Sequence, residues 1–205
     1  MKKVIALFVL GSMILTGCPK HEVIPAPEPQ VDLEAKFTGT VNGANIELTE
    51  NVEGFYLDAS KVKTIQPSPT PSTAVYYADF KSGQTLTSIK VNLGSLSFDA
   101  SVNNQEPLLE TFNTFFTTNN IPSYSYQAAS GFEVIYRDNL GQIFRSNPTL
   151  GGITPNVAFT NIVQESDNSG DYSKFTCTFK CTVFNVADST PIVIDNAVYK
   201  GWFKR

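Results

Sequence analysis

Hydrophobic and polar residues alternate with a period of two over most of the chain after residue 35. The longest alternation runs from Lys174 to Phe184, where phenylalanine, cysteine and valine occupy every second position and lysine and threonine fill most of the positions between. This pattern predicts strands with one face in a core and the other in solvent. Short segments with the composition of tight turns separate these strands: Asn42-Gly43, Asp138-Asn-Leu-Gly141 and Asp167-Asn-Ser-Gly170.

One segment has a helical period instead. Between residues 107 and 118 the large apolar side chains recur at i, i+1, i+4, i+7 and i+8: Leu108, Leu109, Phe112, Phe115 and Phe116. This spacing predicts one short amphipathic helix near 107–118, which we expect to cover the end of a β core. A phenylalanine-rich ligand pocket is the alternative interpretation of the same residues.

The predicted fold is all-β. The alternating segments amount to about ten to twelve strands, with 86–91 and 93–98 counted as two and with 193–194 counted apart from 197–203. Together with the single helix they predict an antiparallel β-sandwich or flattened barrel, formed as one domain by residues 35–205.

The N-terminus has the layout of an export signal. A basic start, Met1-Lys2-Lys3, precedes a run of mostly apolar residues from Val4 to Leu15, which is too short to span a bilayer. Leu15-Thr16-Gly17-Cys18 then resembles the lipobox of bacterial lipoproteins. The resemblance implies that residues 1–17 are a signal peptide and that Cys18 is lipidated and becomes the first residue of the mature protein.

The same resemblance implies a place in the cell envelope. In that family an Asp after the lipidated cysteine is the usual signal for retention at the inner membrane. This chain has Pro19 there, so we expect the outer membrane, with the periplasmic or surface side left open. The last seventy-five residues or so also loosely resemble small β-rich envelope lipoproteins with no assigned activity, a likeness that carries no site.

A proline-rich segment follows the lipobox. Residues 18–34 contain Pro19, Pro25, Pro27 and Pro29, which favour extended polyproline II. At about 3.1 Å per residue, such a tether holds a domain up to ~45 Å from a membrane. The one histidine of the chain, His21, lies in this tether, where a catalytic or metal-binding geometry is hard to maintain.

Charge and histidine content narrow the possible functions. The formal charge is −4 and becomes −6 if residues 1–17 are removed, because two lysines and no acid are lost. This balance disfavours nucleic acid and anionic lipid head groups as partners. Because only one histidine is present, Ser-His-Asp and Cys-His arrangements within the domain are excluded, and no HExxH or CxxC pattern occurs. We therefore expect a protein that is not an enzyme and has no cofactor.

The two other cysteines, Cys177 and Cys181, lie four residues apart on the longest predicted strand. In a straight strand their Cα atoms are ~13 Å apart, whereas a disulfide needs about 7 Å or less. We expect both to be unpaired core residues.

Two groups of residues are candidates for binding. The acidic turn with Asp167 and Asp171 could ligate calcium, but it lacks the full EF-hand spacing, and a plain hairpin turn built from turn-forming residues is the favoured interpretation. Trp202 lies on the strand face opposite Tyr199 and Phe203, so the pattern predicts that it is exposed. Tyr124 and Tyr126 flank Ser125 near a proline loop. These three aromatic residues are candidate ligand contacts, such as a sugar-binding platform.

Four functional hypotheses follow. The first is a lipid-anchored envelope protein with a non-catalytic binding or scaffolding role, whose partners are the membrane through Cys18 and an envelope protein or a glycan. The second is a glycan-binding accessory lipoprotein of an outer-membrane uptake system. The third is a carboxylate-dependent hydrolase, which requires two facing carboxyl groups, and the fourth is a small barrel enclosing an apolar ligand.

Overall fold

A computed structural model describes residues 28–128 and 130–205 and contains ten antiparallel strands and one α-helix in this part of the chain. The strands are β1 (Lys36–Val41), β2 (Ala44–Thr49), β3 (Phe55–Thr64), β4 (Ser72–Ser82), β5 (Ser88–Phe98), β6 (Phe132–Arg137), β7 (Ile143–Ser146), β8 (Asn156–Asp167), β9 (Gly170–Asn185) and β10 (Pro191–Lys204). The helix is α2 (Leu109–Thr118), and three single 3₁₀ turns are η2 (Asn103–Gln105), η3 (Tyr126–Ala128) and η4 (Pro148–Leu150). The all-β prediction is confirmed.

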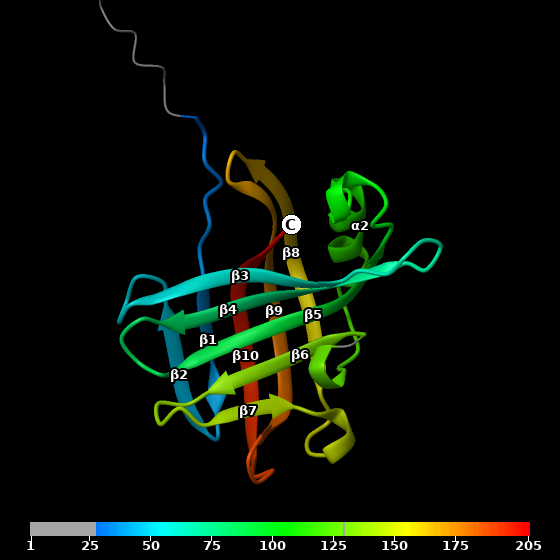
Figure 1. Ribbon diagram of the computed structural model, residues 1–205. Coiled ribbons are helices and arrows are strands. Elements are labelled where there is room, and N and C mark those ends of the chain that lie inside the picture. Colours follow the sequence, from blue (N-terminus) through cyan, green and yellow to red (C-terminus); the bar gives the residue numbers. More distant parts are fainter. Residues whose placement is uncertain (1–27, 129) are drawn as a thin grey trace, which may run out of the picture.

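The strands form one continuous sheet that folds over itself into two layers. The strand order is β2-β1-β10-β9-β7-β6-β5-β4-β3, and β8 pairs with β9 beside this path. In Figure 1 strands β3 to β7 form one layer, and β1, β8, β9 and β10 run across them in the other. This crossed arrangement is one of the two common ways for sheets to pack.

The longest strand, β9, connects the two layers. It pairs with β10 along one edge, while its other edge pairs first with β8 and then, near its C-terminal end, with β7, where Ser146 lies opposite Val183. Its inward face alternates as predicted, since Phe175, Cys177 and Phe179 are at most 3% exposed.

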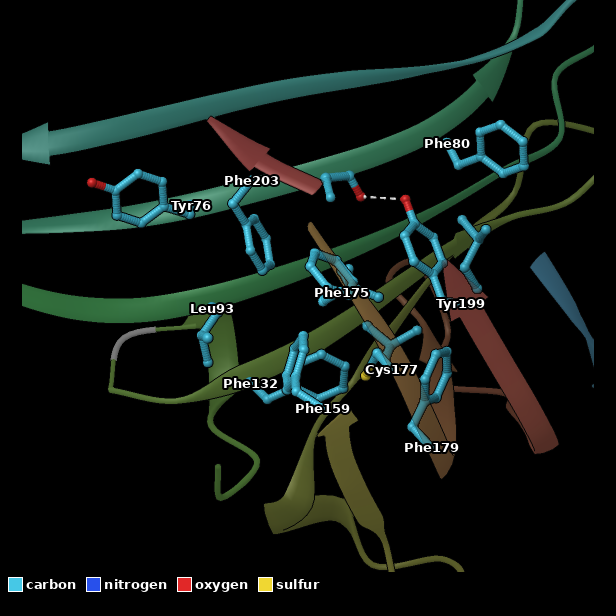
Figure 2. Close-up of a cluster of buried hydrophobic side chains, with 14 of the residues drawn as sticks. Tyr76, Phe80, Leu93, Phe132, Phe159, Phe175, Cys177, Phe179, Tyr199 and Phe203 are labelled. Atoms are coloured by element: carbon cyan, nitrogen blue, oxygen red, sulfur yellow. Dashed lines mark hydrogen bonds between the residues drawn. The ribbon is translucent and has the colours of Figure 1, made fainter. Parts of the chain in front are cut away.

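Aromatic rings fill the space between the layers (Figure 2). Phe175 of β9 stacks on Phe203 and on Tyr199 of β10, with ring centroids 4.7 and 6.0 Å apart. The buried Tyr199 hydroxyl donates a hydrogen bond of 3.0 Å to the Ala78 carbonyl of β4 in the opposite layer. A polar tip therefore links the layers without leaving a buried hydroxyl unpaired.

The helix α2 covers one end of this core, as the periodicity predicts (Figure 1). Phe112 and Phe116 are buried and meet the ring of Tyr76 edge-on at 5.4 and 5.2 Å. Leu108 and Leu109 are 49% and 39% exposed. The covered face of the helix is narrower than the stripe of five residues, because the helix begins only at Leu109 and packs at the end of the sandwich.

The prediction divided two strands that are continuous. Residues 88–98 form one strand, and so do residues 191–204, each with a register shift where the sequence pattern breaks. In β10 the shift falls between Ile194 and Ala197, and Asn196 there has a φ of 49°. A bulge changes the alternation by one residue while the strand continues, so a period of two appears to stop and restart.

Part of the predicted tether belongs to the domain. The Val31 N–H donates to the Asp167 carboxylate at 2.9 Å, Lys174 Nζ donates to the Asp32 carbonyl at 3.1 Å, and Glu34 pairs with Lys200. Val31 and Leu33 pack against the hydrophobic core. The tether interpretation therefore needs correction for residues 31–34, because their side chains have core and charged partners that the proline pattern did not indicate.

The helix makes a direct test of the core possible. Phe112→Ala removes a fully buried ring that contacts Tyr76 and Phe116, so we expect the free energy of unfolding to fall by about 3–5 kcal/mol. Leu108→Ala is the matched control, because Leu108 is half exposed, and should change it by about 0.5 kcal/mol or less. Urea unfolding measures both, and equal effects would show that the helix does not cover the core.

Candidate functional site

A cleft lies beside the loop between β7 and β8. Figure 1 shows this loop at the end of the sandwich remote from the point where residues 28–34 join the domain. The volume of the cleft is about 200 Å³. Three parts of the chain form its wall: Tyr124, the end of β7 with the loop that follows it, and the C-terminal part of β9. The residues of the last two are Ser146, Asn147, Pro148, Gly151, Gly152, Ile153, Thr154, Pro155, Cys181 and Thr182. The lining is mostly small, uncharged side chains and backbone, which suits a small neutral group.

Tyr124 is the one candidate ligand contact that the structure places in this wall. Its hydroxyl lies 3.2 Å from both the Asn156 carbonyl of β8 and the Lys180 carbonyl of β9, so the side chain bridges two strands. Its ring meets Phe132 edge-on at 5.2 Å. Tyr126 follows in the same loop and is 48% exposed, but it is not among the residues that line the cleft.

The loop between β7 and β8 fits closely against β9. Gly152 has a φ of 104°, and a Cβ atom there would lie 2.2 Å from Thr182 Oγ1. The Ile153 N–H donates a hydrogen bond of 3.0 Å to the same oxygen. Glycine is therefore required at this position both for the backbone conformation and for the close approach to β9.

The thiol of Cys181 in the cleft wall is not reactive at neutral pH. Cys177 and Cys181 are both buried and unpaired on one strand, which confirms the prediction from their spacing. Burial raises the pKa of Cys181 to about 12 and also raises the pKa of Cys177. Because the thiolate is the reactive form, Cys181 at neutral pH is a wall of the site and not a nucleophile.

A buried carboxylate, Glu133, was missed by the sequence analysis. It occupies a position on β6 that the alternation assigns to solvent, yet it is 1% exposed. Its oxygens accept hydrogen bonds from Asn92 Nδ2 at 2.9 Å and from the Gln127 N–H at 3.2 Å, and Arg145 Nε lies 2.7 Å away. Glu133 thereby ties β5 and β7 to the loop that carries Tyr124.

The environment of Glu133 opposes its charge. Burial raises the pKa of this carboxyl above its ordinary value, while the bond from Asn92 and the charge of Arg145 act to lower it, and burial prevails. A carboxyl group with an altered pKa marks a candidate functional position, and Glu133 lies outside the lining of the Tyr124 cleft. The sequence signal that could have indicated it is the charge in the middle of an otherwise hydrophobic strand.

The carboxylates of the two calcium candidates, Asp167 and Asp171, accept hydrogen bonds from other residues of the protein. The Asp167 carboxylate accepts backbone N–H bonds from Ser169, Gly170 and Val31, and the Asp171 carboxylate is bound by Ser166 and Arg205. Within the described residues no three His, Cys, Asp or Glu side chains lie close enough together to hold a metal ion. The turn itself forms as predicted between β8 and β9.

The prediction of an exposed Trp202 is wrong. Its relative exposure is 7%. It lies opposite Lys174 in the β9–β10 register, and Lys174 is the residue that binds the Asp32 carbonyl. The chain at Asp32 therefore lies over the outward face of β9 and β10 at this point. Trp202 does not join Tyr124 and Tyr126 in a platform.

The predicted lipidation site Cys18, the signal peptide 1–17 and His21 lie outside the described residues. In the described part, no helix is both long and apolar enough to cross a membrane.

Comparisons with known proteins return no match: no family model, no curated protein and no solved structure is similar to this chain.

The Glu133 environment makes a prediction about pH. Because its pKa is raised in the folded state, the folded protein binds more protons than the unfolded chain at a pH just above the ordinary glutamate pKa, and stability contributed by this group falls as pH rises through that window. Glu133→Gln keeps the acceptor for Asn92 but cannot ionise. We expect the stability of the variant relative to wild type to increase as the pH rises above the pKa of an ordinary glutamate.

Asp171→Asn is the control with the opposite sign. Burial alone would raise the pKa of Asp171, but hydrogen bonds from Ser166 and Arg205 outweigh it and lower the pKa. This group stabilises the fold above its ordinary pKa, so wild type should lose its advantage over Asp171→Asn as pH falls. Urea midpoints between pH 3 and about pH 8 measure both, and parallel curves for wild type and Glu133→Gln would contradict the assignment.

Proposed function

We propose that this protein is a lipid-anchored binding protein of the bacterial cell envelope, held at the outer membrane, which acts without catalysis and receives a small neutral ligand in the Tyr124 cleft. The observation that carries the proposal is the arrangement along the molecule. The lipobox precedes a segment that joins the domain beside the β8–β9 turn, and the cleft lies at the other end.

The contacts of residues 31–34 support an oriented domain. Because the Val31 N–H, the Asp32 carbonyl and the Glu34 carboxylate each have a partner in the domain, residues 31–34 are not available as part of a spacer. A shorter spacer restricts the directions that the domain can adopt at a membrane. The anchor then lies on the side of the β8–β9 turn, and the cleft opens away from the lipid.

The chemistry of the cleft supports binding over catalysis. Its thiol has a pKa of about 12 and its tyrosine hydroxyl, whose pKa is raised by burial, already contacts two carbonyls. Neither group is poised to transfer a proton or attack a substrate near neutral pH. The Ser146 hydroxyl accepts the Val134 N–H, so its own proton remains available to a ligand in the cleft.

Lipid anchoring is tested on the cysteine itself. Cys18→Ala removes the sulfur that carries the diacylglyceryl group, so we expect the protein to lose labelling by radioactive palmitate and to leave the membrane fraction. Pro19→Asp is the matched variant, since it should keep the lipid but move the protein to the inner membrane. Palmitate labelling of the Cys18→Ala variant at the wild-type level would refute the anchor.

Binding in the cleft is tested separately. Native mass spectrometry of the purified protein should show a co-purified small molecule, and Ile153→Trp should abolish that adduct because the larger ring fills a cleft of about 200 Å³. Val62→Trp is the control, because Val62 is 58% exposed on β3 and does not line the cleft. An adduct that persists in Ile153→Trp would place the ligand elsewhere.

A further inference from the structure

The outward face of β3 to β7 carries an ordered set of polar and aromatic side chains, and it is a different surface from the Tyr124 cleft. The strand register places them in two rows. One row is Ser60, Tyr77, Asn92 and Glu133, and the next is Asp58, Asp79, Lys90, Ile135 and Arg145. With strands about 4.8 Å apart, the first row is roughly 14 Å long.

The charges on this face are balanced. Lys81 pairs with Asp58 at 2.5 Å, Lys90 with Asp79 at 3.3 Å and Arg145 with Glu133 at 2.7 Å. Each of these three cations therefore has an acid beside it, and neither sign dominates among the six groups. A strip of this kind has no net attraction for an anion or a cation, but it offers many charge-assisted hydrogen bonds.

Two acceptor oxygens in the strip have no partner. Asn92 Oδ1 and Asp79 Oδ1 are inaccessible to solvent and accept no hydrogen bond within the described residues. Asn92 as a whole is 1% exposed. Buried acceptors without a donor are rare in folded proteins, where ordered water commonly satisfies them, so a ligand hydroxyl that reaches such an oxygen gains a hydrogen bond.

An aromatic ring and a movable cation lie directly beside these oxygens. Tyr77 is opposite Asn92 in the register, and Lys90 Nζ lies 5.7 Å from the centre of its ring. The lysine stem is flexible and partly exposed, so it can leave the ring and uncover both the ring face and Asp79. In a third row, beyond Asp58 and Asp79, Lys81 Nζ lies 5.5 Å from the centre of the Tyr56 ring.

We propose that the strip formed by Tyr77, Asp79 and Lys90 binds a neutral saccharide. When Lys90 leaves the Tyr77 ring, sugar hydroxyls donate to Asp79 Oδ1 and accept from Lys90, and the apolar face of a sugar ring packs on Tyr77, while Asn92 stays buried beneath them. The charge balance selects an uncharged polymer. This site replaces the Trp202 platform that the sequence suggested, because Trp202 is buried.

The experiment uses the full-length protein, purified in detergent, in native gels that contain a mannan, a xylan or a β-glucan. We expect at least one of these polymers to retard the wild-type protein. Tyr77→Ala and Lys90→Ala should each raise the dissociation constant about tenfold, the change given by the loss of one aromatic or charge-assisted contact.

Lys36→Ala is the matched control, since it removes from β1 a partly exposed lysine that is likewise paired with an acid, Glu47, and lies outside the strip. It should leave the retardation unchanged. Lys90→Ala also keeps the test valid if Tyr77→Ala fails to fold, because Lys90 is partly exposed.

Three results overturn the inference: no retardation by any neutral polymer, retardation only by an acidic polymer such as pectate, or equal effects of Lys90→Ala and Lys36→Ala. None of these results bears on Cys18 or on the Tyr124 cleft, so the proposed function and this inference fail separately.

Discussion

The fold depends on the pairing of β9 with strands of both layers. Its sixteen residues bond to β10 on one edge and to β8 and then β7 on the other, so one strand holds the two layers in a fixed crossing. The inward side chains of β9 then supply the centre of the core, where Phe175 stacks on Tyr199 and Phe203. A polar residue at such a position would leave an unpaired group between the layers.

The candidate sites follow from this geometry. The cleft opens where β9 passes from β8 to β7, because the loop between these two strands must cross the end of the sheet, and Gly152 lets it lie against Thr182. Glu133 fixes the other wall, since it joins Asn92 and Arg145 to the loop of Tyr124. The outward strip is a consequence of register, which aligns residues from four or five strands that are distant in sequence.

Prediction from sequence succeeded where the structure is local. The helix with Phe112 and Phe116, the turns at Asn42-Gly43 and Asp138–Gly141, and the unpaired cysteines of β9 are all present, because each depends on a short period or on strand spacing. The division of β5 and β10 was wrong because a bulge interrupts a period without ending a strand. Glu133 and Trp202 were misplaced because their burial depends on a loop or a segment that packs from elsewhere in the chain.

The amino-acid sequence alone determined that this is an all-β domain with one short helix, and its alternation settled which face of each regular strand enters the core. It also supplied residues 15–18, which resemble a lipobox, and a single histidine, from which we propose an anchored, non-catalytic role. Only the tertiary structure decided which side chains meet across strands, that the chain at Val31 to Glu34 is part of the domain, and that Trp202 lies inside. The physical reason is that alternation fixes the direction of a side chain relative to its own strand, whereas burial and partnership are set by what packs against that strand.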